Sequence, residues 1–248
     1  SAVKARDLRS NSKQILKLKK AYEAKYSNGF FATKRGEIIP ADKDKQYCIE
    51  LSYLGKNLTA WYMQRPNLSY GETKIFDKYF NTLFKNDYLP EDAYALSFWM
   101  RKIMDAWTQE NPLGLEEELL TMKAYAPYHL LFAISMVFAK CNNQTNVPSP
   151  SECLKVASEN NLVDSIINIA ANCLNSAISA EKNNCEQNNK SFIPQNWVKN
   201  KSCNAGIMSA IQNYFSFLPT MNKEMDSKLK NGVKIDSKYF SYRVQAED

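Results

Sequence analysis

Apolar residues recur every three to four positions along most of the chain after Pro40, the spacing that places them on one face of an α-helix. The predicted helices cover 52–64, 73–84, 90–109, 116–139 with an interruption at Pro127, 151–159, 162–180, 206–215 and 221–230. The polar segment 183–190 (NNCEQNNK) predicts a solvated loop. The fold class is therefore expected to be mainly α, as a helical bundle or array.

The only convincing β signal lies near the N-terminus, after a basic helix that ends at Asn28-Gly29. The aromatic run 30–33 (FFAT) predicts a strand, 34–36 (KRG) a turn, and 37–39 (EII) the returning strand of a β-hairpin. A lone two-stranded ribbon is marginally stable in water, so we expect this small N-terminal β ribbon to pack on the helices.

The polar, proline-bearing segment 141–150 (CNNQTNVPSP) is the best internal boundary in the chain. It predicts a helical domain over 47–140 and a C-terminal helical region over 141–248. Residues 1–46 then form a basic helix plus the β-hairpin. Because the chain starts abruptly without a methionine, we expect residues 1–46 to be the end of a truncated upstream domain.

Positive charge is concentrated in the first forty residues. Positions 1–40 contain ten Lys/Arg and three Asp/Glu, whereas positions 41–248 contain 22 and 23. The formal net charge of +6 therefore resides in the first sixth of the chain, where it attracts phosphate-bearing or acidic partners. The predicted nucleic-acid contacts are Lys13, Lys17, Lys20, Lys34, Arg35 and Arg65. The alternatives are a solvated helix face for the lysines and capping of helix carbonyls for Arg65.

Other site chemistry has little support in the sequence. His129 is the single histidine and lies in an apolar helical segment, which predicts a packed core residue. Glu50 is followed by Leu51-Ser52, without the x-Lys of a metal-dependent nuclease. Only seven glycines are present, which argues against phosphate-binding loops. We therefore expect no catalytic residue, no metal and no cofactor.

Composition also constrains the cellular setting. The six cysteines show no CxxC pair, which predicts free thiols in a reducing cytoplasm. No run of about 20 apolar residues exists, so no membrane partner is expected. Aromatic residues at helical spacing are predicted to be core rather than base-stacking surfaces; they are Trp61, Tyr62, Phe76, Phe80, Trp99 and Trp107.

The order of several short motifs resembles the abortive infection phage resistance (AIPR) family of bacterial proteins. The run AVKARDLRSN at 2–11 precedes an apolar-basic helix and FFATKRGE, where the family shows a D-x-x-S-N run, a helix and an aromatic strand entering an Arg-Gly turn. Gln64-Arg65-Pro66 and the segment 75–80 (IFDKYF) continue the similarity. The resemblance covers about 1–105, and the rest is similar only as a helical tail.

The resemblance implies the C-terminal part of a bacterial anti-phage (abortive infection) defence protein. It also implies that the active centre lies upstream, where some family members are thought to carry a nuclease domain. This fragment is therefore expected not to be catalytic on its own. We interpret the chain as a nucleic-acid-associated module; the alternative is a non-catalytic protein-interaction scaffold of a defence complex. The expected partners are nucleic acid, the upstream domain and, for a homo-oligomer, a second copy.

Overall fold

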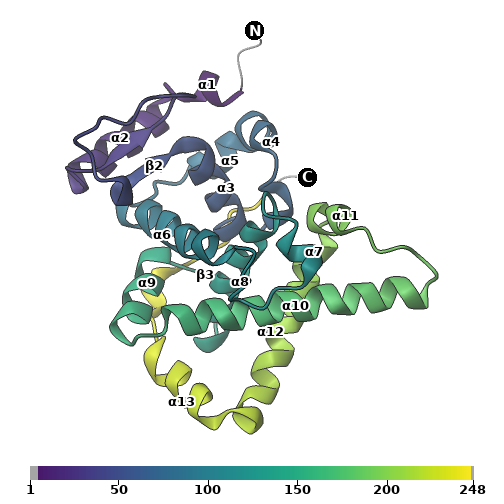
Figure 1. The fold of residues 1–248 in the computed structure, drawn as a ribbon. Coiled ribbons are helices and arrows are strands. Elements are labelled where there is room, and N and C mark those ends of the chain that lie inside the picture. The colour runs from purple at the N-terminus through teal and green to yellow at the C-terminus, as the bar shows by residue number, and fades with distance from the viewer. Residues whose placement is uncertain (1–4, 247–248) are drawn as a thin grey trace.

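The computed structural model describes residues 5–246, in which thirteen α-helices and three short 3-10 helices carry most of the chain (Figure 1). Two two-stranded sheets complete the described part. The expectation of a mainly α fold with a small β element near the N-terminus is confirmed. The N-terminal elements lie at one end of the molecule, and α13 (Lys223–Gly232) lies at the other (Figure 1).

Within the described residues, the first half of the chain contains seven α-helices, two short 3-10 helices and both strands of the first sheet. They are α1 (Ala5–Arg9), α2 (Lys13–Lys25), β1 (Phe30–Ala32), η1 (Lys45–Tyr47), β2 (Cys48–Glu50), α3 (Leu51–Trp61), η2 (Pro66–Leu68), α4 (Glu72–Asp77), α5 (Phe80–Phe84), α6 (Pro90–Ala106) and α7 (Glu117–Leu120). The segment 73–84, predicted as a single helix, forms two short helices, because the helical conformation is interrupted between Asp77 and Phe80.

The second half is built around α8 (Ala126–Cys141), which is buried along most of its length. The remaining elements are β3 (Val147–Pro148), α9 (Pro150–Glu159), α10 (Val163–Gln187), α11 (Pro194–Lys199), α12 (Ser202–Met221), α13, η3 (Ser237–Tyr239) and β4 (Phe240–Ser241). Helix α10 extends beyond the other helices (Figure 1). Its last turns occupy most of the segment predicted as a loop over 183–190, so that prediction is wrong.

The predicted β-hairpin is also wrong. Strand β1 forms as expected, but it pairs in parallel with β2, with Phe31 opposite Ile49. The turn after β1 is present, since Glu37 N–H donates to Lys34 O at 3.3 Å and Gly36 has a φ of +70°. Residues 37–39 do not return as a strand, because the Glu37 carboxylate accepts the backbone N–H groups of Thr33 and Lys34 and closes the turn on itself.

Helix α2 packs through the predicted apolar stripe. Ile15, Leu18 and Tyr22 are buried, and the Ser12 hydroxyl caps the helix by accepting the N–H of Ile15. The Tyr22 hydroxyl donates to Tyr47 O at 2.7 Å and so ties α2 to the start of β2. The N-terminal helix is therefore attached to the rest of the chain by both apolar and polar contacts.

One apolar cluster runs from Ile15 to Val244 and includes all six aromatic residues predicted to be core. The segment 141–150 takes part in it through the buried Val147, and it is also tied to α3, because Trp61 Nε1 donates to Pro148 O at 2.8 Å. Near the C-terminus, β4 pairs antiparallel with β3, and Val244 N–H donates to Tyr62 O. The predicted division of the chain into 1–46, 47–140 and 141–248 stays a prediction.

Among residues 5–246, none of the helices combines the length and the apolar character that crossing a lipid bilayer requires.

Candidate functional site

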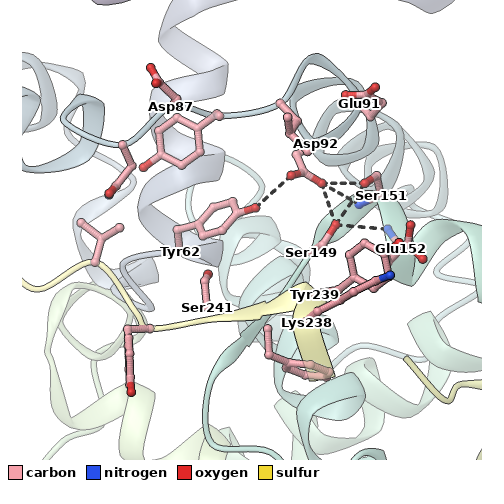
Figure 2. A pocket seen from close by; sticks show the side chains of 16 residues that line it. Tyr62, Asp87, Glu91, Asp92, Ser149, Ser151, Glu152, Lys238, Tyr239 and Ser241 are labelled. Carbon is pink, nitrogen blue, oxygen red and sulfur yellow. Dashed lines mark hydrogen bonds between the residues drawn. The ribbon is translucent and has the colours of Figure 1, made fainter. Parts of the chain in front are cut away.

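Two hollows on the described surface are large enough for a ligand. The first, which we call the Asp92 pocket, has a volume of about 550 Å³ and lies where α6, α9 and the strand β4 meet (Figure 2). Its wall carries the carboxylates of Asp87, Glu91, Asp92 and Glu152 together with Lys238.

Asp92 is buried and accepts four hydrogen bonds in this pocket (Figure 2). Its Oδ1 accepts from Ser149 Oγ at 2.8 Å, from Ser151 Oγ at 2.7 Å and from Ser151 N at 3.1 Å. Its Oδ2 accepts from the Tyr62 hydroxyl at 3.3 Å. Burial raises the pKa of Tyr62, so that the phenol remains a neutral donor to Asp92. The carboxylate therefore joins α3, α6 and the start of α9.

This arrangement is an anchor rather than a reactive centre. Ser149 is the N-cap of α9. Its hydroxyl oxygen accepts a hydrogen bond from the N–H of Glu152, and its O–H donates a hydrogen bond to Asp92. Activation of a serine nucleophile requires a neighbouring general base that a third group orients. Here the Asp92 carboxylate is occupied by four structural hydrogen bonds, and His129 is not among its partners. Among residues 5–246, no three His, Cys, Asp or Glu side chains gather as metal ligands.

His129 is a core residue, as predicted. Its ring is 1% exposed, with Nδ1 3.2 Å from Tyr125 O and Nε2 2.9 Å from Val198 O. The ring also stacks on Trp197, with centroids 6.2 Å apart. Burial penalises the charged imidazolium and lowers the pKa of His129 to about 4. At neutral pH the residue is therefore an uncharged link between α8 and α11.

Acid should destabilise the wild-type fold through His129. The unfolded imidazole has a pKa of 6.5 and the folded one a pKa of about 4, so the unfolded chain binds the extra proton as the pH falls between these values. The free energy of unfolding should lose about 3 kcal/mol from this residue over that range, since each pKa unit corresponds to about 1.4 kcal/mol. Urea unfolding at a series of pH values measures the loss.

The comparison variant for this measurement is His129→Gln, which keeps hydrogen-bonding capacity but does not titrate. Carboxylates contribute equally to both proteins, so the difference between the two curves isolates the imidazole. Parallel curves for wild type and variant between pH 6.5 and 4 would contradict the lowered pKa of His129.

The second hollow, which we call the basic groove, has a volume of about 800 Å³. It lies between the turn after β1, the strand β2, the start of α3, the face of α6 and the turn before α8. The groove is lined by Ala32, Lys34, Gly36, Glu37, Ile39, Cys48, Ile49, Glu50, Tyr53, Lys56, Asn57, Ser97, Met100, Arg101, Met104, Lys123, Ala124, Pro127 and Tyr128.

Four cations line the basic groove, and they are Lys34, Lys56, Arg101 and Lys123. Its two carboxylates are already engaged: Glu37 accepts two backbone N–H groups, and Glu50 accepts Arg6 Nη1 and Ser52 Oγ. Within residues 5–246, no salt bridge joins any of the four cations to a carboxylate. The groove therefore offers positive charge that is open to an anionic ligand.

Two helices begin at the basic groove. Tyr53 belongs to the first turn of α3, and Pro127 and Tyr128 belong to the first turn of α8. The N-terminal end of a helix carries a partial positive charge and unpaired N–H groups. These ends add partial positive charge to that of the four side chains.

The structure distributes the predicted contacts over three places. Lys13, Lys17 and Lys20 lie on the exposed face of α2, and Lys17 pairs with Asp87 at 3.0 Å. Lys34 lines the basic groove, while Arg35 is exposed in the same turn outside the lining. Arg65 is half-buried beside η2, where its Nε donates to Asn67 Oδ1 at 3.4 Å.

The sequence did not point to the other groove cations. Lys56, Arg101 and Lys123 lie on three separate elements, in a part of the chain whose overall charge is slightly negative. A local excess of Lys/Arg detects α2 but cannot detect cations that meet only after folding. Comparison with family models, with curated proteins and with solved structures gives no match to this chain.

Proposed function

We propose that the chain is a nucleic-acid-associated module that binds phosphate backbone in the basic groove. The observation that carries the proposal is the convergence of Lys34, Lys56, Arg101 and Lys123 on one open hollow, with both neighbouring carboxylates engaged elsewhere. Lys and Arg side chains on phosphates supply most of the affinity of non-specific nucleic-acid binding. The exposed lysines of α2 lie outside the lining of this groove.

The motif order over 1–105 supports a wider role for this module, as the C-terminal part of a bacterial anti-phage defence protein. In that role the groove holds nucleic acid, and the active centre that the resemblance implies lies upstream. The six free thiols support action in the reducing cytoplasm.

Removing two exposed groove cations should weaken the salt dependence of nucleic-acid binding. Each neutralised phosphate contributes about 0.7–0.9 to the slope of log affinity against log salt. The double substitution Lys34→Ala, Lys123→Ala should therefore reduce the slope by up to about 2. Both side chains are exposed, so the cost in folding stability should stay within about 0.5 kcal/mol each. Fluorescence anisotropy titrations at several salt concentrations measure the slope.

A matched control removes the same charge from the exposed face of α2, with Lys13→Ala and Lys20→Ala. The groove proposal expects the control to retain most of the wild-type slope. If the α2 pair reduces the slope and the groove pair does not, the basic helix is the binding surface and the groove is excluded.

A second candidate function is a protein-interaction scaffold, which the exposed apolar side chains of α12 favour. Phe217 is 61% and Met221 71% exposed, four residues apart on one helical face. Exposed apolar side chains on adjoining turns of one helix can contribute to a docking surface. The scaffold alone predicts that no nucleic acid binds at physiological salt, so the same titrations separate the two functions.

A further inference from the structure

We infer that the basic groove seats an unpaired nucleotide of a single strand, and that one face of α3 reads it. This inference rests on the proposed function and specifies its ligand. Tyr53, Lys56 and Asn57 stand at positions i, i+3 and i+4 of α3, so their side chains share one side of the helix. All three line the groove. They present an aromatic face, a cation and an amide side by side.

Asn57 lines the groove and carries a buried acceptor without a partner. The residue is 4% exposed, and its Oδ1 is buried without a hydrogen-bond partner among the described residues. Buried polar atoms are paired in nearly all native proteins, and an unpaired one is often explained by a ligand. Because Oδ1 itself is buried, a ligand reaches it only when the amide of Asn57 turns toward the groove; a ligand that then donates an N–H to Oδ1 and accepts from the amide nitrogen would satisfy Asn57. The edge of an unpaired base offers such a donor beside an acceptor.

Tyr53 and Lys56 supply the other parts of a nucleotide site. Tyr53 is 56% exposed although it lines the groove, so its ring is open to stacking. Lys56 Nζ lies 5.5 Å from the centre of that ring and 6.0 Å from the centre of the Tyr128 ring. An ammonium beside an aromatic ring is the combination with which proteins hold single strands, with the base on the ring and the backbone on the cation.

The chemistry favours a single strand over a duplex. A duplex keeps its bases stacked on each other and its pairing edges hidden, so Tyr53 and Asn57 would have no partner there. The groove volume of about 800 Å³ lies within the usual range of about 300–1,000 Å³ for ligand sites. Additional cations at Lys34, Arg101 and Lys123 can follow the phosphates on either side of the seated nucleotide.

The experiment compares three ligands of equal length by fluorescence anisotropy at one salt concentration. They are a mixed-sequence single strand, an abasic single strand and the duplex. The wild-type chain should bind the base-bearing strand about tenfold more tightly than the abasic strand, because stacking of a base on an aromatic side chain is worth roughly 5- to 150-fold in affinity. It should also bind the single strand more tightly than the duplex, despite the higher charge density of the duplex.

Two variants assign this preference to α3. Asn57→Leu should lower affinity for the base-bearing strand about tenfold and leave the abasic strand unaffected, since one base-edge contact is lost. Its melting temperature should be unchanged or higher, because an unpaired buried acceptor has been removed; an asparagine with a purely structural role would lower it. Tyr53→Ala should remove the stacking part of the preference. The matched control is Tyr242→Ala, which deletes a tyrosine that is 86% exposed and lies outside the groove.

The outcomes distinguish the inference from the proposed function. Salt-dependent binding of all three ligands with equal affinity would leave the proposed function standing and end the inference. The absence of binding to any ligand would end both. A free nucleoside monophosphate serves as competitor: displacement at the concentration at which the oligonucleotide itself competes would overturn the assignment to a strand.

Discussion

Replacing Asp92 with alanine is expected to lower the free energy of unfolding by about 2–4 kcal/mol, because it removes the shared acceptor of four hydrogen bonds, each worth about 0.5–1.5 kcal/mol. The carboxylate is 5% exposed and accepts from Ser149 Oγ, from the N–H and Oγ of Ser151 and from the Tyr62 hydroxyl. Alanine would leave the buried Tyr62 hydroxyl without this acceptor, and an unsatisfied buried group costs about 1–3 kcal/mol. Ser149 and Ser151 are half-buried at the pocket wall, where water can replace part of what they lose. Urea denaturation followed by circular dichroism measures the change.

The neighbouring carboxylate is the matched control for Asp92. Glu91 forms a salt bridge with Lys25 at 3.2 Å, and both side chains are substantially exposed. Glu91→Ala should therefore cost no more than about 1 kcal/mol, as for other surface ion pairs. Equal effects of the two substitutions would show that Asp92 is not the anchor that its contacts indicate. The loss in the free energy of unfolding caused by Asp92→Asn should lie between those of Asp92→Ala and Glu91→Ala, because the amide keeps one acceptor oxygen.

The helical part of the fold was predictable because the apolar spacing of these segments agrees with their burial. The segment predicted over 90–109 forms α6 over Pro90–Ala106, and the proline at its first turn is compatible with a helix start. In these segments the local preference and the tertiary environment favour the same structure.

The errors arise where distant contacts decide the structure. The aromatic strand β1 takes a partner eighteen residues away, with Phe30 opposite Cys48, instead of the adjacent segment. A turn signal and a nearby apolar pair, Ile38 and Ile39, predicted a hairpin, but these two side chains are exposed. Helix α10 continues through a polar segment because side chains one turn apart support it, such as Asn188 Nδ2 donating to Asn184 O at 2.7 Å.

In the candidate site, too, local sequence predicted one part, and contacts between distant segments decide the rest. Lys34 was predicted as a phosphate contact and does line the basic groove. The remaining cations and Asn57 come from elements whose sequences read as ordinary amphipathic helices or turns. The side chains on α3 that we assign to the nucleotide lie three and four residues apart, which a sequence pattern cannot distinguish from any half-exposed helix face. Only the neighbouring elements reveal that this face looks into a groove.

Substitution of Trp61 is expected to cause a large loss in the free energy of unfolding, and it also tests how the chain divides into folding units. Its side chain is fully buried at the end of α3, and its Nε1 donates to Pro148 O at 2.8 Å, within the segment predicted to separate two domains. Trp61→Ala should lower the free energy of unfolding by about 3–5 kcal/mol, because it removes a large buried ring and leaves a cavity. Trp61→Phe should cost less, about 1–2 kcal/mol, since it removes mainly the hydrogen bond and leaves Pro148 O unsatisfied.

The folding units can be followed in the Trp61→Ala variant through its remaining tryptophans. Trp99 and Trp107 report on the part before residue 141, and Trp197 reports on the part after it. Since one apolar cluster spans both parts, we expect a single urea transition in which fluorescence and circular dichroism coincide and only the midpoint decreases. Two separated transitions, with only one displaced by the substitution, would instead show that 47–140 and 141–248 unfold as independent units despite the Trp61–Pro148 contact.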